Sequence, residues 1–331
     1  MLQAIPEPKR AAVARALTAA FGTDEPDALT PLSGGLSGGE VYRLRVGGIA
    51  YVLRIEAPAD GFRDPARAYA CMNAAAGACL APAVRYACAA DGVAIMDFVP
   101  ERSLALDYAG SKAELMTELG QAVRVLHETP GFPPLMDYLD GMDLLIGQFR
   151  AQAADSAAEE ALARYGEIAA AYRRLPADPV SSHNDLNPRN VIYDGRRLWL
   201  IDWESAFRAD RYVDLAAMTG FFAADEAEAE AGLRAYFRRP PVAAERARLF
   251  LARQIGHVFY GIMFLGGALA ERPGEAPPDG ARALGELHAA IGLGEPVLER
   301  WEGRAAYGQA RFAAMLEALD GPGLPAALAA L

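Results

Sequence analysis

Hydrophobic and polar residues follow two different periods along the chain. Val13, Leu17 and Phe21 recur at helical spacing, which predicts an amphipathic helix after Pro8. From residue 29 to residue 97 the pattern changes to short strands separated by glycine-containing turns. The predicted strands are VYRLRV (41–46), YVLRIE (51–56), AVRYAC (83–88) and GVAIMDF (92–98), with one helix predicted between them over about 64–78.

After Phe98 the helical period dominates. Helices are predicted over 111–128, 136–152, 154–174, 212–223, 225–238, 241–268, 280–292 and 295–319, and one β-hairpin, VIYD-GRR-LWLID, interrupts them. The order of elements predicts an α+β fold with two lobes and a cleft between them. Residues 1–98 form a small antiparallel β lobe with a leading helix, and residues 99–331 form a larger helical lobe with the inserted hairpin.

Composition narrows the class of protein. Hydrophobic residues make up 53% and charged residues 23% of the 331 residues, which excludes a disordered chain. The net charge of −11 disfavours nucleic-acid binding. Residues 1–97 carry nine basic and ten acidic side chains, so most of the negative charge lies in the remainder. An acidic C-terminal part attracts a cationic ligand, although it also serves simply as a solubilising surface.

No segment predicts a membrane or an oxidising compartment. The N-terminus MLQAIPEPKR lacks the layout of a signal peptide. The uncharged run from Gln254 to Ala270 has 17 residues, fewer than the roughly 20 of a membrane span, and predicts a buried helix. Cys71, Cys79 and Cys88 lack a metal-ligand spacing and are expected to be reduced thiols. We therefore expect a soluble, cytoplasmic protein without a membrane or nucleic-acid partner; the sequence leaves open a homodimer.

The strongest chemical signal is SHNDLNPRN (182–190), followed by the hairpin and IDWE (201–204). Asp185 and Asn190, five residues apart on an irregular loop, can direct a carboxylate and an amide to one place. Asp202 follows the apolar strand LWLI, where a carboxylate is costly unless a cation neutralises it. Phosphoryl transfer needs such a set, namely a carboxylate for the acceptor's proton and oxygen ligands for Mg²⁺.

These residues resemble the kinase catalytic loop, H-x-D-x-x-x-x-N. In detail their sequence is similar to the motif of the aminoglycoside phosphotransferase and choline kinase family. The resemblance implies an ATP- and Mg²⁺-dependent kinase of protein-kinase-like fold. It implies that Asp185 is the catalytic base, that His183 braces the loop, and that Asn190 and Asp202 bind Mg²⁺. Asp214, in the segment VDLA, is then expected to cap a helix and anchor the catalytic loop.

A nucleotide site is expected in the β-rich lobe. The turn before VYRLRV is rich in glycine, which lets backbone N–H groups approach phosphates, and no GxxxxGK[ST] motif is present. Arg54 occupies the strand position that kinases give to lysine, but residues 65–90 contain no acid to pair with it, and Asp64 is the nearest. The residues predicted to bind nucleotide are Ser33, Gly34, Gly35, Ser37, Gly38, Arg54 and the hinge-like Met96, Asp97 and Phe98.

The acceptor is harder to predict. Asn184 and Glu204 are part of the motifs HND and IDWE, which are similar to the corresponding motifs of choline kinases. The C-terminal part also offers aromatic and acidic side chains, the combination that holds a quaternary ammonium, although aromatic residues usually pack a core. The acceptor-site candidates are Glu204, Trp203 and Trp301, and further aromatic residues are Tyr236, Phe259 and Tyr260.

Other functions remain open at this stage. A small amino or sugar alcohol other than choline or ethanolamine, or an aminoglycoside, could accept the phosphoryl group. The missing acidic partner of Arg54 motivates a non-catalytic nucleotide-binding pseudokinase, against which the complete set of Asp185, Asn190 and Asp202 argues. A metal-dependent hydrolase fits less well, because the four histidines show no HxH or HExxH pairing.

Overall fold

The computed structural model describes residues 2–32, 39–152, 156–277 and 282–331. The contacts divide the chain into two compact units. Unit 1 consists of Met1–Ala109, Gln121–Leu135 and Val180–Arg208, and unit 2 consists of Gly110–Gly120, Met136–Pro179 and Ala209–Leu331. The predicted catalytic loop and hairpin, which the sequence placed in the helical lobe, thus group with the N-terminal residues.

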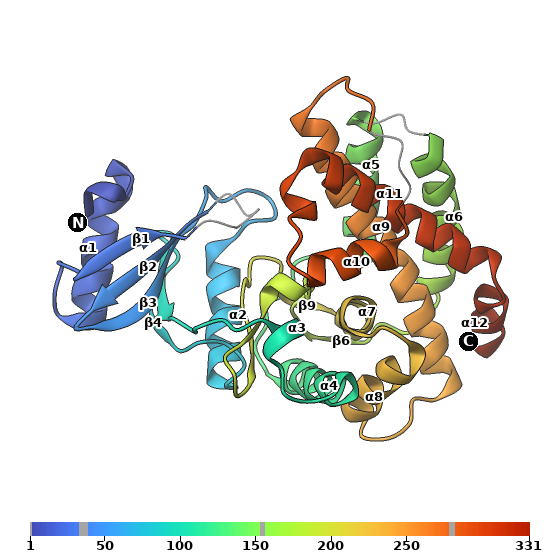
Figure 1. The fold of residues 1–331 in the computed structure, drawn as a ribbon, viewed down its shortest axis with the longest axis horizontal. Coiled ribbons are helices and arrows are strands. Elements are labelled where there is room, and N and C mark those ends of the chain that lie inside the picture. Colours follow the sequence, from blue (N-terminus) through green and yellow to red (C-terminus); the bar gives the residue numbers. More distant parts are fainter. Residues whose placement is uncertain (1, 33–38, 153–155, 278–281) are drawn as a thin grey trace. The chain divides into compact units, whose positions relative to one another are not determined.

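Unit 1 is built around a five-stranded antiparallel sheet with the order β1-β2-β3-β5-β4 (Figure 1). The four predicted strands are confirmed with ends that shift by at most two residues. β1 was not predicted, since its sequence ALTP shows no clear alternation. The strands are β1 (Ala28–Pro31), β2 (Glu40–Val46), β3 (Ile49–Ile55), β4 (Val84–Cys88) and β5 (Val93–Asp97).

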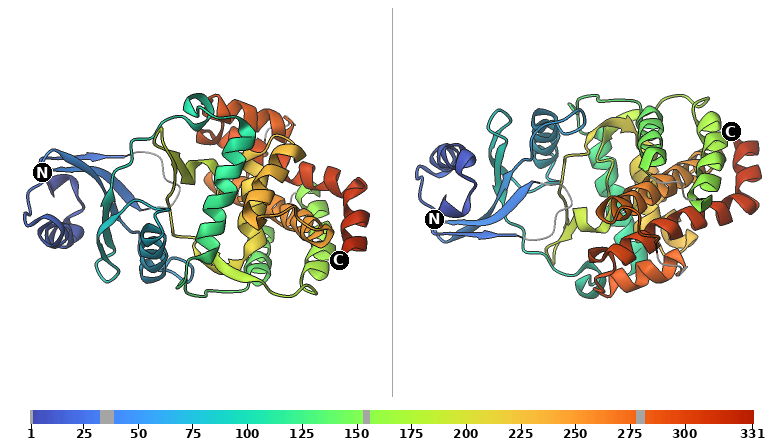
Figure 2. Two further views of the ribbon diagram at one scale, coloured as in Figure 1. Left: turned by 90° about the horizontal axis from the view of Figure 1, so that it is seen from below. Right: turned by 90° about the horizontal axis from the view of Figure 1, so that it is seen from above.

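Helix α1 (Glu7–Phe21) covers one face of this sheet (Figures 1 and 2). Val13 and Leu17 of the helix pack in one buried cluster with Leu44, Leu53 and Ile95 of the strands. Successive residues of a strand point to opposite faces, so the residues between these core positions lie on the face away from α1. The alternation that predicted the strands therefore also divides the sheet into a core face and a second face.

Shorter elements complete unit 1. Helix α2 (Pro65–Gly77) begins after Asp64, whose carboxylate accepts a hydrogen bond from the Ala66 N–H at 2.9 Å, as an N-cap residue does. The predicted hairpin is confirmed, with Gly195 at its turn in the left-handed region (φ 92°). Its strands and the remaining short elements are β6 (Pro179–Ser182), β7 (Val191–Tyr193), β8 (Leu198–Leu200), β9 (Phe207–Asp210), α3 (Leu104–Asp107) and two 3-10 turns, Leu2–Ala4 and Pro188–Asn190.

Unit 2 is helical. Every helix predicted after Phe98 is present, although the segment predicted as one helix over 295–319 is a 3-10 turn (Val297–Glu299) followed by α11. Helix α4 (Lys112–Glu128) begins in unit 2 and ends among the residues of unit 1. The other helices are α5 (Tyr138–Gln152), α6 (Ser156–Tyr172), α7 (Arg211–Phe222), α8 (Glu226–Phe237), α9 (Ala243–Glu271), α10 (Leu284–Gly292), α11 (Trp301–Asp320) and α12 (Gly323–Ala330).

The longest of these helices, α9, forms the centre of unit 2. It packs against α5, α6, α7, α11 and α12 (Figures 1 and 2). Among the described residues, α9 is the one helix long and apolar enough to cross a bilayer, yet 61% of its most apolar window is buried. The expectation that Gln254–Ala270 belongs to a buried helix is met.

Candidate active site

The predicted catalytic loop follows β6 and ends in the 3-10 turn Pro188–Asn190. Both carboxylate oxygens of Asp185 accept hydrogen bonds at 3.0 Å, one from the Asn187 amide and the other from the Asn190 amide. The Asn190 amide also reaches the Asp185 carbonyl at 2.9 Å. Two asparagines therefore orient the carboxylate that the sequence identified as the proton acceptor.

His183 connects this loop with the residue before Asp202. Its imidazole is fully buried, and Nε2 lies 2.9 Å from the Ile201 carbonyl. The ring also lies 4.7 Å from the ring of Trp203. From the other side, the Ile201 N–H donates to the Asn190 carbonyl at 3.0 Å. These two contacts hold the end of β8 beside the catalytic loop.

Asp202 has a backbone conformation that sequence reasoning did not predict. Its φ is 65°, and Asn184 in the catalytic loop has φ 63°. Aspartate and asparagine tolerate the left-handed region better than most residues, but the conformation still costs free energy and recurs at functional sites. The Asn184 amide stabilises this arrangement by donating to the Ser205 carbonyl at 3.0 Å.

Arg54, on β3, meets three carboxylates within unit 1. Its guanidinium pairs with Glu56 at 2.9 Å, with Asp202 at 3.1 Å, and with Glu204. Asp64, which the sequence offered as the nearest acid, caps α2 instead. Glu56 is two residues from Arg54 and directly follows β3, so the alternation of the strand predicted over 51–56 could have revealed it. Glu204 could not be found this way, since 150 residues separate it from Arg54.

The charges of this group perturb one another. Burial by itself lowers the pKa of Arg54, but Asp202, Glu56 and Glu204 outweigh it and raise that pKa above its usual value. Burial raises the pKa of Glu204 to about 7, with Asp202 and Glu56 adding to the rise and Arg54 opposing it. Three carboxylates around one guanidinium carry an excess of negative charge, which favours a further cation near Asp202.

A second arginine, which the sequence did not single out, anchors the segment after Asp202. Arg67 of α2 is 3% exposed and donates to the carbonyls of Glu204 and Ala206, each at 3.0 Å, and to that of Phe62. Helix α2 thus contributes an arginine bound to main-chain carbonyls rather than a glutamate bound to Arg54.

Of the predicted nucleotide residues that the structure describes, Arg54 and Met96 share the face of the sheet away from α1. Val52 is opposite Met96 in the β3–β5 pairing, and Arg54 is opposite Ala94, so Arg54 and Met96 are on this face. The ring of Phe98 lies 4.4 Å from the guanidinium carbon of Arg43, the β2 residue opposite Val52.

Asp97 behaves differently from its neighbours. Its carboxylate makes two hydrogen bonds with Arg85 of β4, at 2.6 and 2.8 Å. The side chain is thereby turned away from the face that carries Arg54. A role of Asp97 in binding nucleotide would therefore be left to its backbone.

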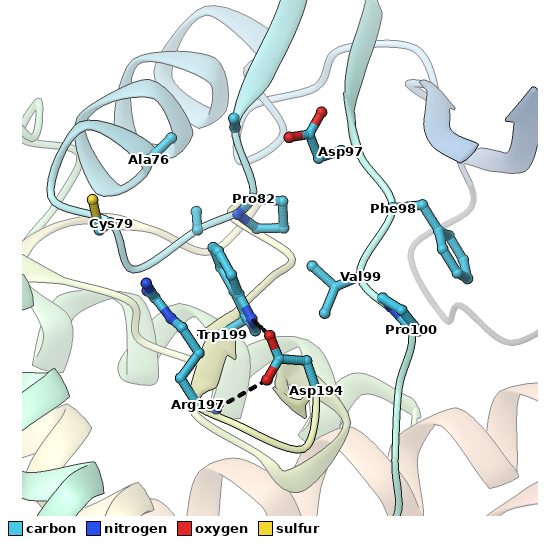
Figure 3. Close-up of a pocket in the computed structure, with 12 residues that line it drawn as sticks. Ala76, Cys79, Pro82, Asp97, Phe98, Val99, Pro100, Asp194, Arg197 and Trp199 are labelled. Atoms are coloured by element: carbon cyan, nitrogen blue, oxygen red, sulfur yellow. Dashed lines mark hydrogen bonds between the residues drawn. The ribbon is translucent and has the colours of Figure 1, made fainter. Parts of the chain in front are cut away.

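A pocket of about 310 Å³ lies beside the segment 97–100 (Figure 3). Cys79, Pro82 and Trp199 line it, and the Trp199 N–H donates to Asp194 at 2.8 Å. Figure 3 shows Val99 pointing toward Trp199, whereas the ring of Phe98 points away to the other side of the segment. Neither Arg54 nor Met96 lines this pocket.

The remaining predicted residues are distributed as follows. Ser33, Gly34, Gly35, Ser37 and Gly38 lie outside the described residues. The predicted acceptor residue Trp203 is 5% exposed and packs at 6.0 Å from the ring of Phe132 as well as against His183. Trp301, in unit 2, is 6% exposed, and its N–H donates to the Ala268 carbonyl. These surroundings are those of core residues.

The oxygen donors suit Mg²⁺ better than a softer metal. Asp202 offers carboxylate oxygens and Asn190 an amide oxygen, and both belong to segments joined through Ile201. Mg²⁺ commonly keeps several waters and takes few protein ligands. Among the described residues there is no cluster of three His, Cys, Asp or Glu side chains arranged to hold a metal, as Zn²⁺ would require.

Solved structures show the same fold. A choline/ethanolamine kinase family protein from Mesorhizobium loti matches with a TM-score of 0.72 and 21% identity, over 100% of this chain and 99% of that one. The choline kinase LicA from Streptococcus pneumoniae matches with a TM-score of 0.63 and 15% identity, over 92% and 99%. A spectinomycin phosphotransferase in complex with ADP and spectinomycin matches with a TM-score of 0.56 and 13% identity, over 80% and 89%.

The sequence itself matches at the level of a family. No curated protein matches this chain. Residues 28–251, more than half of the chain, match the phosphotransferase enzyme family, and this range includes Arg54, Asp185 and Asp202. The predicted α+β, protein-kinase-like fold and the prediction of a small-molecule kinase are confirmed. The chain belongs to the phosphotransferase enzyme family.

Proposed function

We propose that this protein transfers the γ-phosphoryl group of ATP, with Mg²⁺, to the hydroxyl group of a small molecule. One observation carries the proposal: Ile201 is bonded to both His183 and Asn190, while Asp202 next to it pairs with Arg54. A proton acceptor, oxygen ligands and a phosphate-binding cation are thereby joined by direct contacts. Phosphoryl transfer depends almost entirely on positioning and charge stabilisation, which such a set supplies.

Asp185 is the proposed base. The amides of Asn187 and Asn190 orient its carboxylate toward the acceptor hydroxyl, whose proton it takes as the new P–O bond forms. His183 does not touch the reacting atoms in this proposal. It holds the Ile201 carbonyl and so keeps Asp202 in position.

Asn190 and Asp202 are the proposed ligands of Mg²⁺, which would neutralise charge on the phosphates and polarise them. Arg54 would bind the phosphates as a planar, always-charged fork. Glu56 and Glu204 hold its guanidinium in place before nucleotide binds. The acidic partners of Arg54 remove the observation that motivated a pseudokinase.

The adenine is proposed to lie against the face of the sheet that carries Met96, next to the segment of Phe98. Support comes from the shared face of Arg54 and Met96 and from Phe98 beside Arg43. The glycine-rich segment 33–38 lies outside the described residues, and its predicted role of offering backbone N–H groups to the phosphates stays a prediction. A soluble, cytoplasmic enzyme fits this use of ATP, and Cys71, Cys79 and Cys88 are free thiols.

As the acceptor we propose a small amino alcohol of the choline or ethanolamine type. Two of the structures reported above are described as a choline/ethanolamine kinase family protein and a choline kinase, and an ethanolamine kinase from Plasmodium vivax also matches, with a TM-score of 0.58. The motifs HND and IDWE also favour an acceptor of this type. Glu204 is the acidic acceptor residue in this proposal, whereas the burial of Trp203 and Trp301 argues against direct contact with a ligand.

The test is ADP release from ATP and Mg²⁺ in the presence of choline, ethanolamine, homoserine, methylthioribose, thiamine and aminoglycosides. We expect stimulation by at least one amino alcohol and a loss of about 10²- to 10⁴-fold in the Asp185→Ala variant. ATP affinity of that variant, measured separately by calorimetry, should remain close to wild type. A fully active Asp185→Ala variant would remove Asp185 from the role of base.

A further inference from the structure

A buried arginine in unit 2 lies inside a group of aromatic rings. The guanidinium carbon of Arg311 (α11) is 4.6 Å from the ring centre of Phe221 (α7), 5.1 Å from that of Tyr260 (α9) and 5.1 Å from that of Tyr307 (α11). His288 of α10 completes the group, here called the Arg311 cluster. These helices lie together within unit 2 (Figures 1 and 2).

Arg311 has few hydrogen-bond partners for so buried a cation. It is 4% exposed; one terminal nitrogen donates to the Tyr307 hydroxyl at 2.6 Å and lies 3.4 Å from His288 Nε2. Its Nε is buried without a partner. Within the described part of the chain Arg311 makes no ion pair, so its partners are neutral groups and aromatic faces.

Arg248, in the same unit, is a second arginine that stacks on aromatic rings, and its surroundings can be compared with those of Arg311. Its guanidinium carbon lies 5.1 Å from the ring centre of Tyr172 and 4.9 Å from that of Tyr212, which is the same kind of stacking. Unlike Arg311, it pairs with the carboxylate of Asp210. Burying a cation without an opposite charge costs far more than burying a pair. Among the described residues, Arg311 therefore lacks the carboxylate partner that Arg248 has.

The pKa values of the two nearby histidines are lowered by burial and, in addition, by the positive charge of Arg311. Burial lowers the pKa of His288 to about 4, and Arg311 adds to the decrease. Burial also lowers the pKa of His257, with further contributions from Arg311, His288 and Arg253. Arg253 itself is paired with Glu226, so Arg311 is the uncompensated charge of this region. Neutral imidazoles can still donate a hydrogen bond to an anion.

We propose that the Arg311 cluster binds the oxyanion, carboxylate or phosphate, of a small molecule. Phe221 and His288, which contact the guanidinium, are partly exposed, and in this proposal the ligand approaches Arg311 past them. The aromatic rings already stack on the Arg311 guanidinium, so we do not expect them to bind the ammonium group of a ligand. An oxyanion would instead find Arg311 as a charged donor in a place of low polarity, where such hydrogen bonds are strong.

The oxyanion could come from two sources. The acceptor could carry it, as in a hydroxy amino acid; the inference then rests on the proposed phosphoryl transfer and replaces choline or ethanolamine by an amino alcohol that bears a carboxylate. Alternatively, it could belong to a separate small anion bound in unit 2. Both sources require Arg311, and two experiments distinguish them.

The first experiment needs no catalysis. Inorganic phosphate is titrated calorimetrically into the wild-type protein, into Arg54→Gln, which removes phosphate binding at the proposed nucleotide site, and into Arg54→Gln carrying Arg311→Gln in addition. Because a charged hydrogen-bond donor is lost, the phosphate binding that remains in Arg54→Gln should weaken at least about tenfold when Arg311→Gln is added. If Arg311→Gln does not fold, Arg311→Lys, which keeps the charge but loses the fork, should show a smaller loss. Undiminished phosphate binding in either folded Arg311 variant, or no binding to Arg54→Gln, would overturn the proposal.

The second experiment compares acceptors that differ by one carboxylate, namely ethanolamine with serine and 3-aminopropan-1-ol with homoserine. A KM lower for the acid-bearing member, with the advantage lost in Arg311→Gln, assigns the oxyanion to the acceptor. Equal KM values, together with Arg311-dependent phosphate binding, assign it to a separate ligand. ADP release with none of the acceptors would count against the proposed function and leave the phosphate titration as the test of the cluster.

Discussion

Replacing Arg67 with methionine tests whether α2 supports the site through main-chain contacts. Methionine retains the apolar stem but loses every donor of the guanidinium. The hydrogen bonds removed are those to the carbonyls of Glu204 and Ala206, each at 3.0 Å, and the local one to Phe62. The first two connect α2 with the segment that follows Asp202, so the change should affect both stability and nucleotide use.

The expected loss follows from these contacts. A hydrogen bond from a charged donor contributes about 1.5–3 kcal/mol, because removing the donor leaves a buried acceptor unsatisfied. Two such bonds give at least about 3 kcal/mol before compensation. Burial is the main factor that lowers the pKa of Arg67, so removing the cation recovers part of its desolvation cost. We therefore expect a net loss of about 2–3 kcal/mol in the free energy of unfolding of unit 1.

The assay is urea unfolding followed by far-UV circular dichroism, with KM for ATP measured on the same variant. Arg63→Met is the matched control, since the Arg63 side chain is 43% exposed and its one ion pair is with Asp60 on the surface. We expect no resolvable loss of stability in the control and a several-fold rise in KM for ATP only in Arg67→Met. Equal unfolding midpoints for the two variants would refute the reasoning.

Three further outcomes are expected. Asp202→Asn should raise the half-saturating Mg²⁺ concentration for ADP release at least about tenfold, since an amide replaces a charged ligand; an unchanged Mg²⁺ titration would argue against this role. Burial lowers the pKa of His288 to about 4, so between pH 6.5 and 4 the unfolded chain binds more protons at this residue than the folded protein does. The free energy of unfolding should therefore fall as the pH is lowered through this range, and the contribution of His288 should be about 3 kcal/mol at most. His288→Asn should flatten this pH dependence of the urea midpoint. Trp301→Phe should lower stability through the lost bond to Ala268 without changing the acceptor's KM, and a tenfold KM increase would restore Trp301 to the acceptor site.

The order and type of most elements could be predicted because each has a clear period of apolar residues. The strands at 41–46 and 51–56 alternate, and their core face packs on α1 as alternation requires. Short segments without such a period were not predicted. ALTP in β1 and FRAD in β9 become strands through pairing with other strands, a tertiary effect that a local pattern does not contain.

The candidate site was predictable where residue types and spacing carry the chemistry. Asp185 and Asn190 lie within one loop, so five residues of sequence are enough to suggest that they meet, and their side chains do form a hydrogen bond. Only some of the acidic partners of Arg54 could be predicted from the sequence. Glu56 follows from strand alternation, but Glu204 meets Arg54 through a tertiary contact within unit 1 between segments 150 residues apart.

Arg67 and Arg311 mark the limit of sequence reasoning, and for the same physical reason. A buried arginine is unusual and must be explained by what surrounds it, which a linear pattern does not reveal. The terminal nitrogens of Arg67 donate to main-chain carbonyls of Ala206, Glu204 and Phe62, although its Nε, like that of Arg311, is buried without a partner. Among the described residues, Arg311 contacts aromatic rings and neutral acceptors but no acid, in contrast to Arg248. The sequence offered Tyr260 among the aromatic residues that could surround the ammonium of an acceptor; in the structure the Tyr260 ring stacks on the guanidinium of Arg311, a cation of the protein itself.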